Sequence, residues 1–176
     1  MNLPSGKVIK TGMDSATINF TSLLDELKRK QFNGYLAFAI KGAGGVEEAT
    51  ILFDSGKFVG CEYEYLLYNK KFAGQEAFQR IINAVSAACG VIDVVQLTQE
   101  QVHLSLAVNE DLVFVPQDRD LKALKPGKFS PFFEEQFKGK AKEEKQDLLK
   151  KFKLDSLKKI EGKTDEVLKK LGENAR

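Results

Sequence analysis

The 176-residue sequence is poor in the side chains from which metal sites and disulfide frameworks are built. It holds two cysteines, Cys61 and Cys89, which form no CxxC motif, and a single histidine, His103. Structural zinc sites take four cysteine or histidine ligands, so we expect no zinc site, no other metal and no cofactor. A disulfide is not expected either, and both cysteines are predicted to be buried among apolar side chains.

Long hydrophobic runs are also absent. A membrane-spanning helix needs roughly 20 consecutive apolar residues, and no segment of the chain approaches that length. Residues 1–12 carry no apolar stretch of the length found in signal peptides. We therefore predict a cytoplasmic protein without a transmembrane segment. Because 43% of the residues are hydrophobic and only four are proline, the chain can form a globular core.

The small net charge of +2 conceals a strong asymmetry along the chain. Residues 1–120 hold 11 Lys+Arg against 15 Asp+Glu, whereas residues 121–176 hold 16 against 10. The body therefore carries a net charge of −4 and the remainder a net charge of +6. This segregation predicts two functional parts, the second of which is attracted to acidic surfaces.

Hydrophobic periodicity predicts an α+β body in which an antiparallel sheet of about four strands is covered by helices. Alternating apolar residues predict strands over residues 35–40, 48–54, 57–65 and 91–97. A turn at Asp54-Ser55-Gly56-Lys57 joins the second of these strands to the third, as in a hairpin.

Helical spacing of apolar residues predicts helices over residues 20–30, 74–89 and 98–108. We expect Thr21 to cap the first helix and Gly90 to stop the second. Thr98 and Gln101 have the spacing of a capping box at the start of the third helix. Its expected apolar stripe is formed by Val102, Leu104, Leu106 and Val108.

Composition divides the chain into three parts. Residues 1–117 form the α+β body, residues 118–138 a phenylalanine-rich linker or docking segment, and residues 139–176 a basic helical C-terminal extension. Four phenylalanines crowd the middle part, namely Phe129, Phe132, Phe133 and Phe137. They either dock on the core of the body or form a binding surface for another protein.

The sequence shows no evident phosphate-binding motif or set of catalytic residues. The glycine-containing segments 5–7 and 55–57 lack the GxxxxGK[ST] pattern of a phosphate-binding loop. His103 lies inside the apolar stripe of a predicted helix and has no neighbouring nucleophile in the sequence. Glu62 and Glu64 lie on one face of a predicted strand, where they either serve an enzyme as acid and base or form the solvent face of an edge strand.

The basic extension offers a nucleic-acid-binding alternative. Lys158, Lys159, Gly162 and Lys163 faintly resemble a helix-hairpin-helix, in which the backbone amides of a glycine-containing turn contact phosphate. The second glycine of such a turn is missing. A basic amphipathic extension is also typical of segments that lie on anionic membranes or acidic grooves, and of small bundles with solvated lysines.

Residues 20–106 resemble the PATAN-type domain, named for the N-terminal part of a cyanobacterial response regulator, and related uncharacterised archaeal proteins. The resemblance is carried by FTSLLDELKRKQ, by Asn33-Gly34-Tyr35-Leu36, by ILFDSGKFV, by GQEAF and by GVIDV, in the order of the family. It implies a non-catalytic interaction module of signalling and motility systems, and it supplies no catalytic residues.

The sequence therefore predicts a protein that binds another protein as an adaptor or regulatory module and is not an enzyme. Nucleic-acid binding through the basic extension is the first alternative, and an enzyme using Glu62 and Glu64 is the second. Pairing of an exposed edge strand into a homodimer stays open.

Overall fold

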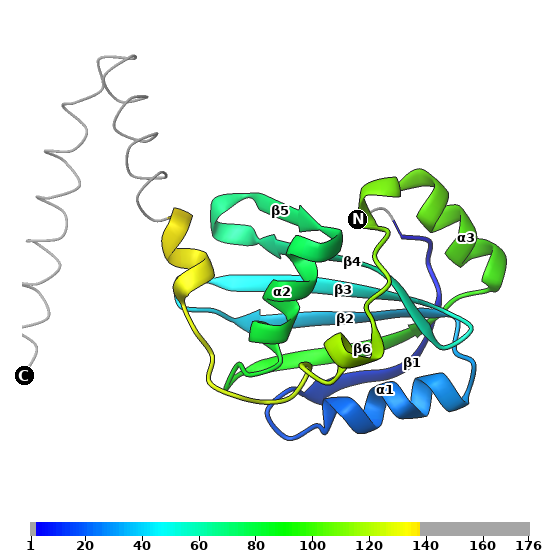
Figure 1. Cartoon of the computed structure of the whole chain (residues 1–176), viewed down its shortest axis with the longest axis horizontal. Coiled ribbons are helices and arrows are strands. Elements are labelled where there is room, and N and C mark those ends of the chain that lie inside the picture. Colours follow the sequence, from blue (N-terminus) through cyan, green and yellow to red (C-terminus); the bar gives the residue numbers. More distant parts are fainter. Residues whose placement is uncertain (1–2, 138–176) are drawn as a thin grey trace, which may run out of the picture. The chain divides into compact units, whose positions relative to one another are not determined.

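The computed structural model describes residues 3–137 of the chain. A first compact unit ends at Glu134, and a second begins at Glu135. The strands are β1 (Lys7–Asp14), β2 (Gly34–Lys41), β3 (Val46–Asp54), β4 (Lys57–Tyr65), β5 (Lys70–Ala73) and β6 (Gly90–Gln96). The helices are α1 (Phe20–Arg29), α2 (Gly74–Ala84), α3 (Gln99–Val108) and the single turn α4 (Asp118–Leu121), with short 3₁₀ turns η1 (Leu66–Tyr68) and η2 (Glu110–Leu112) (Figure 1).

All neighbouring strands are antiparallel, in the order β1-β6-β2-β3-β4-β5. The α+β class and the four predicted strands, which are β2, β3, β4 and β6, are confirmed, but the sheet has six strands and the expected number was too small. The two missed strands are the edges. β1 is almost wholly exposed and β5 has four residues, so neither shows the apolar alternation by which a half-buried strand is recognised.

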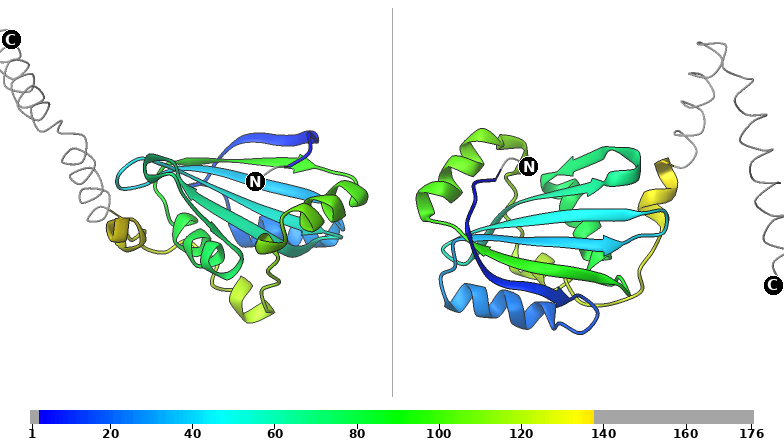
Figure 2. Two further views of the ribbon diagram at one scale, coloured as in Figure 1. Left: turned by 90° about the horizontal axis from the view of Figure 1, so that it is seen from above. Right: turned by 180° about the vertical axis from the view of Figure 1, so that it is seen from behind.

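One face of the sheet carries the main core. Alternate residues of β2 are buried, starting with Leu36 and Phe38, because α1 and α2 pack on that side. Aromatic pairs join the layers: Phe20 of α1 lies 5.3 Å from Phe38, and Phe78 of α2 lies 5.5 Å from Phe58, between ring centroids. In Figure 2, α1, α2 and α4 all lie on this side of the sheet.

The opposite face, here called the open face, is covered only at one end among the described residues. There Val102 of α3 packs with Leu52 and Leu97 in a small separate core, and all three side chains are buried. Over the rest of this face, seen from behind in Figure 2, lies no helix of residues 3–137. It therefore remains available for contact with solvent or another molecule.

Local signals set some helix ends and not others. The capping box of Thr98 and Gln101 is confirmed at the start of α3. The predicted cap of α1 was wrong, because Asn19, not Thr21, accepts the backbone N–H of Ser22. α2 ends at Ala84 without a glycine, and the predicted stop Gly90 instead begins β6.

Residues 126–134, which belong to the predicted linker or docking segment 118–138, lie along the C-terminal end of α2. The side chain of Asn83 donates to the carbonyl of Ser130 at 2.9 Å and accepts from its N–H at 2.8 Å. The N–H of Gly127 donates to Ser86 Oγ at 2.9 Å. Over residues 126–134, the phenylalanine-rich middle part of the chain therefore packs on the α+β body.

No helix within residues 3–137 is both long enough and apolar enough to cross a membrane.

Candidate functional site

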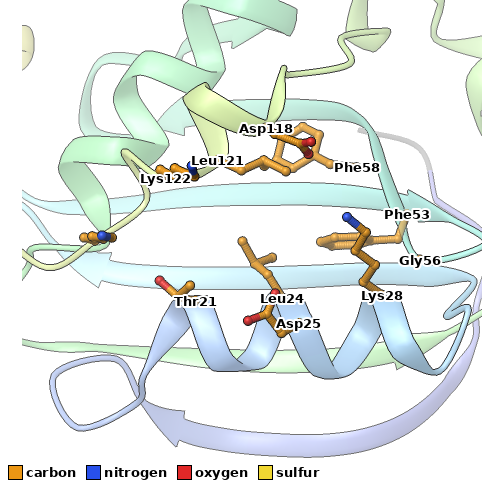
Figure 3. Close-up of a pocket in the computed structure, with 11 residues that line it drawn as sticks. Thr21, Leu24, Asp25, Lys28, Phe53, Gly56, Phe58, Asp118, Leu121 and Lys122 are labelled. Carbon is orange, nitrogen blue, oxygen red and sulfur yellow. The ribbon is translucent and has the colours of Figure 1, made fainter.

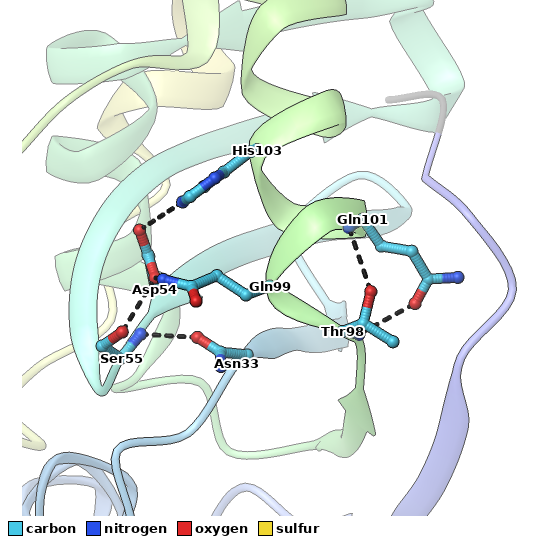
Figure 4. Close-up of polar contacts among 7 residues, drawn as sticks. All are labelled: Asn33, Asp54, Ser55, Thr98, Gln99, Gln101 and His103. Carbon is cyan, nitrogen blue, oxygen red and sulfur yellow. Dashed lines mark hydrogen bonds and ion pairs between the residues drawn. The ribbon is translucent and has the colours of Figure 1, made fainter.

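The turn between β3 and β4 meets the start of α3 in a polar cluster (Figure 4). Ser55 and Gly56 both have positive φ, at 49° and 76°, as in a two-residue hairpin turn. Asn33 Oδ1 accepts the N–H of Ser55 at 2.6 Å and fixes the turn. His103 Nε2 lies 3.0 Å from Asp54 Oδ2, and Ser55 Oγ donates to Asp54 Oδ1 at 3.0 Å.

The carboxylate is the central group of this cluster. Partial burial raises the pKa of Asp54, but hydrogen bonds from His103 and Ser55 and the charge of His103 lower it by more, so the net pKa lies below its ordinary 3.8. A serine nucleophile needs an imidazole between the hydroxyl and the carboxylate, to remove the hydroxyl proton. Here serine and histidine both contact the carboxylate, and the His103 side chain is 58% exposed. The arrangement suits a surface ion pair that ties α3 to the turn.

The cysteines lie apart from this cluster. Cys61 is buried under α2, and its Sγ donates to the carbonyl of Gly74 at 3.2 Å. Burial raises the pKa of the Cys61 thiol to about 12 and keeps it protonated at neutral pH. Cys89 is exposed in the loop before β6, so its predicted burial was wrong. The reason is that α2 ends before this residue, which places it off the packed face of the helix.

Glu62 and Glu64 lie on the open face, among carboxylates contributed by neighbouring strands. Glu64 is the direct cross-strand partner of Glu48, and Glu62 that of Thr50. Like charges placed directly opposite in a sheet are destabilising. Lys71 of β5 forms an ion pair with Glu64 at 3.0 Å, and Glu64 and Glu62 together raise the pKa of Lys71.

Glu62 and Glu64 lie on an open surface and not in a cavity. Neither glutamate lines any of five cavities whose lining residues lie between Ile9 and Phe133. Two apolar side chains of the same sheet, Val46 and Val91, are 49% and 46% exposed at its margins. The open face therefore combines concentrated negative charge with accessible apolar area.

A second acidic group is buried on the helix-covered side. Glu47 is 3% exposed and accepts the hydroxyl of Tyr63, while its second carboxylate oxygen has no hydrogen-bond partner. Burial and the nearby Glu134 raise the pKa of Glu47, against the hydrogen bond from Tyr63. Sequence reasoning missed this residue, although a period of two places it on the same strand face as Ala49 and Ile51.

Glu134 attaches residues 126–134 to the buried region around Glu47. It is 2% exposed, accepts the N–H of Gly44 at 2.9 Å, and accepts the hydroxyl of Tyr68 at 3.2 Å. A Cβ at Gly44 would collide with the Glu134 carboxylate, so a larger residue there would force this side chain to move. Arg80 lies 3.4 Å over the ring of Phe72 and 5.2 Å from the ring of Phe133.

The phenylalanines predicted to bind a partner have different environments. Phe129 and Phe133 are half-buried, and Phe132 is 61% exposed. Phe137 belongs to the second unit and is half-buried. The predicted nucleic-acid contacts Lys158, Lys159, Gly162 and Lys163 lie outside the described residues. Within the described part of the chain, no group of three or more histidine, cysteine, aspartate or glutamate side chains is placed to hold a metal ion.

A family model described as an uncharacterized protein conserved in archaea (DUF2226) matches residues 1–109. The match includes all six strands and the helices α1, α2 and α3. No curated protein and no solved structure matches the chain.

Proposed function

The chain belongs to the family of uncharacterised archaeal proteins DUF2226, and we propose that it is a non-catalytic adaptor that binds a partner protein through the open face of its sheet. The observation that carries the proposal is the placing of Glu48 directly opposite Glu64 on the uncovered part of that face. A cationic partner surface would relieve this repulsion and form charge-assisted contacts on binding.

Exposure on the same face supports protein contact. Glu48 is exposed and makes no hydrogen bond or ion pair with another side chain among residues 3–137. The middle of this face holds the small side chains of Ala37 and Ala39, which are half-buried. An open surface with apolar margins and a charged centre is suited to another protein, because a small ligand is normally bound in a concave pocket.

The resemblance to PATAN-type domains leads to a finer form of the proposal. It implies adaptor work in a signalling or motility system, with no catalytic group of its own. The polar cluster around Asp54 agrees with this role, since its contacts join α3 to the turn between β3 and β4.

The test is affinity capture of cellular partners with the full-length chain, with a form lacking the basic extension, and with the double variant Glu48→Lys, Glu62→Lys. Both positions are on the open face, so the variant is expected to fold and to lose the captured partner. Glu110→Lys is the matched control, because Glu110 is exposed in η2. If the double variant captures the same partner as the wild type, the open face is not the binding surface.

Charge segregation favours one second candidate, nucleic-acid binding by the basic extension. Binding by phosphate neutralisation weakens steeply as the salt concentration rises. Fluorescence anisotropy with labelled duplex and single strands at two salt concentrations separates this candidate from the adaptor. Absence of binding at low salt would eliminate it.

A further inference from the structure

A groove separates α1 from α4 on the helix-covered side of the molecule (Figure 3). Its volume is about 470 Å³, which falls in the range of small-molecule sites. It is lined by Thr21, Leu24, Asp25, Lys28, Phe53, Gly56, Phe58, Asp118, Leu121, Lys122 and Lys125. Of its lining residues, Phe58 also packs against Phe78 of α2. The groove is on the side of the sheet opposite the open face.

The apolar lining comes from both walls and the base. Leu24 of α1 and Leu121 of α4 are half-buried and face the groove, while Phe53 and Phe58 form its base and are 2% and 4% exposed. One end is closed by the turn between β3 and β4. There the N–H of Gly56 donates to the carbonyl of Phe32 at 2.8 Å.

The rim of the groove carries three lysines and two aspartates. Lys28 comes from α1, and Lys122 and Lys125 follow α4 on the other wall. None of the three ammonium groups makes an ion pair within residues 3–137. The two carboxylates of the lining, Asp25 and Asp118, are exposed and leave one positive charge in excess. Low-dielectric walls strengthen the attraction of such a rim for an anion.

Directional hydrogen-bonding groups are scarce on the walls and base of the groove, below its charged rim. Thr21 supplies the one uncharged polar side chain among the residues that line the groove. A sugar or a nucleoside would leave several of its polar groups unpaired here, which costs binding free energy. A hydrocarbon chain has no such groups, and it matches the leucine and phenylalanine lining.

We propose that this groove binds an amphiphile with a single hydrocarbon chain and an anionic head group, the chain lying over Leu24 and Leu121 and the head group meeting Lys122 and Lys125. This inference goes beyond the adaptor function, since it assigns a small-molecule site on the opposite side of the sheet.

Dodecanoate is a suitable probe, used below its critical micelle concentration in isothermal titration calorimetry with the full chain. We expect one molecule to bind, at least about tenfold more tightly than dodecyltrimethylammonium. Dodecyl phosphate, compared in the same way, shows which anionic head group is preferred. Absence of dodecanoate binding, or equal affinity for the cationic amphiphile, would overturn the proposal.

Two variants test the location of the site. The double variant Lys122→Glu, Lys125→Glu is expected to weaken dodecanoate binding about tenfold or more, and Leu121→Asn to weaken it through the lost apolar wall. The matched control Lys7→Glu, Lys41→Glu makes the same change of charge at exposed positions on β1 and β2 and should bind as the wild type does. Equal weakening by both double variants would show general charge attraction and refute the site.

A protein ligand gives a different result. If the groove variants abolish capture of a protein partner while the wild type does not bind dodecanoate, the groove is a protein-docking surface and the amphiphile proposal is wrong. Melting temperatures of all variants, measured in parallel, show whether each is folded.

Discussion

Gly56 shows how much a single backbone position contributes to this fold. Its φ of 76° is in the left-handed region, and a Cβ there would lie 2.7 Å from the Cα of Lys28 in α1. The turn thus has to approach α1 without a side chain, and this approach closes one end of the groove between α1 and α4.

Gly56→Ala is therefore expected to destabilise the protein, by about 1–3 kcal/mol from backbone strain alone and by more from the collision with α1. Gly127→Ala is the control, because an added Cβ at Gly127 would meet only Ser86 Oγ, at 3.6 Å. Its effect should stay within about 0.5 kcal/mol. Urea denaturation of both variants measures the difference, and equal stability of the two would contradict this account of the turn.

Glu47 is the residue whose ionisation we expect to affect stability most clearly. Because its pKa is raised in the folded protein, the folded state binds its proton more tightly than the unfolded chain does. The ionised carboxylate therefore lowers stability at a pH above the raised pKa. This cost disappears as the pH falls through the raised pKa toward the ordinary value of 4.5.

Glu47→Gln removes the charge and should gain stability relative to the wild type at neutral pH, with a gain that shrinks as the pH falls through the raised pKa toward the ordinary value of 4.5. Melting temperatures of both proteins across this range test the trend. Glu48→Gln, on the exposed side of the same strand, serves as the control. A difference between Glu47→Gln and wild type that does not change with pH would refute the assignment of a raised pKa.

At the scale of secondary structure, α3 departs most from its sequence pattern. Its expected apolar stripe was wrong, since Leu104 and Val108 are 61% and 65% exposed, whereas Val102 is fully buried. The helix lies at one end of the sheet and packs only along the narrow strip around Leu52 and Leu97. Leu104 and Val108 therefore lie largely outside the packed strip, whereas Leu106 packs against it.

Val102→Ala should accordingly destabilise the protein by roughly 1–3 kcal/mol, and Leu104→Ala by no more than about 0.5 kcal/mol. Chemical denaturation of the two variants gives the comparison. A cost for Leu104→Ala as large as that for Val102→Ala would mean that Leu104 is covered in solution, by another copy of the chain or by a further segment.

At the scale of the whole molecule, the packing of residues 118–134 decides where a folded fragment can end. Leu124 is fully buried, Glu134 is 2% exposed, and Asn83 holds Ser130 by two hydrogen bonds. The body thus depends on residues that follow its last predicted helix.

We expect a chain ending at Glu134 to unfold cooperatively and to be markedly more stable than a chain ending at Gln117. The shorter chain loses Leu124 and uncovers Arg80 and Glu47, and loss of a buried leucine side chain alone costs about 2–5 kcal/mol. Differential scanning calorimetry of the two fragments measures this. Equal stability would show that residues 118–134 contribute no packing energy in solution.

Much of the fold could be predicted from local pattern. The alternation in β2, β3, β4 and β6 and the helical spacing in α1 and α2 report which side chains are buried, and this signal is strong where one face of an element is covered. In α3 the spacing predicted the helix but not its buried face. The edge strands β1 and β5 were not predicted, because an exposed strand buries no face and so shows no alternation of apolar and polar residues. The candidate sites could be predicted less well: Glu62 and Glu64 were recognised as sharing a face, but Glu47 was not recognised as buried.

By itself, the sequence determined the α+β class, the four inner strands, the hairpin turn at Ser55-Gly56 and the capping box of α3, because these depend on residues that are neighbours in the chain. Only the tertiary structure decided that Asp54 meets His103, that Glu134 reaches Gly44, and that Glu48 lies opposite Glu64 on an uncovered face. Each of these contacts joins distant residues, whose positions are set by the packing of the whole sheet against its helices.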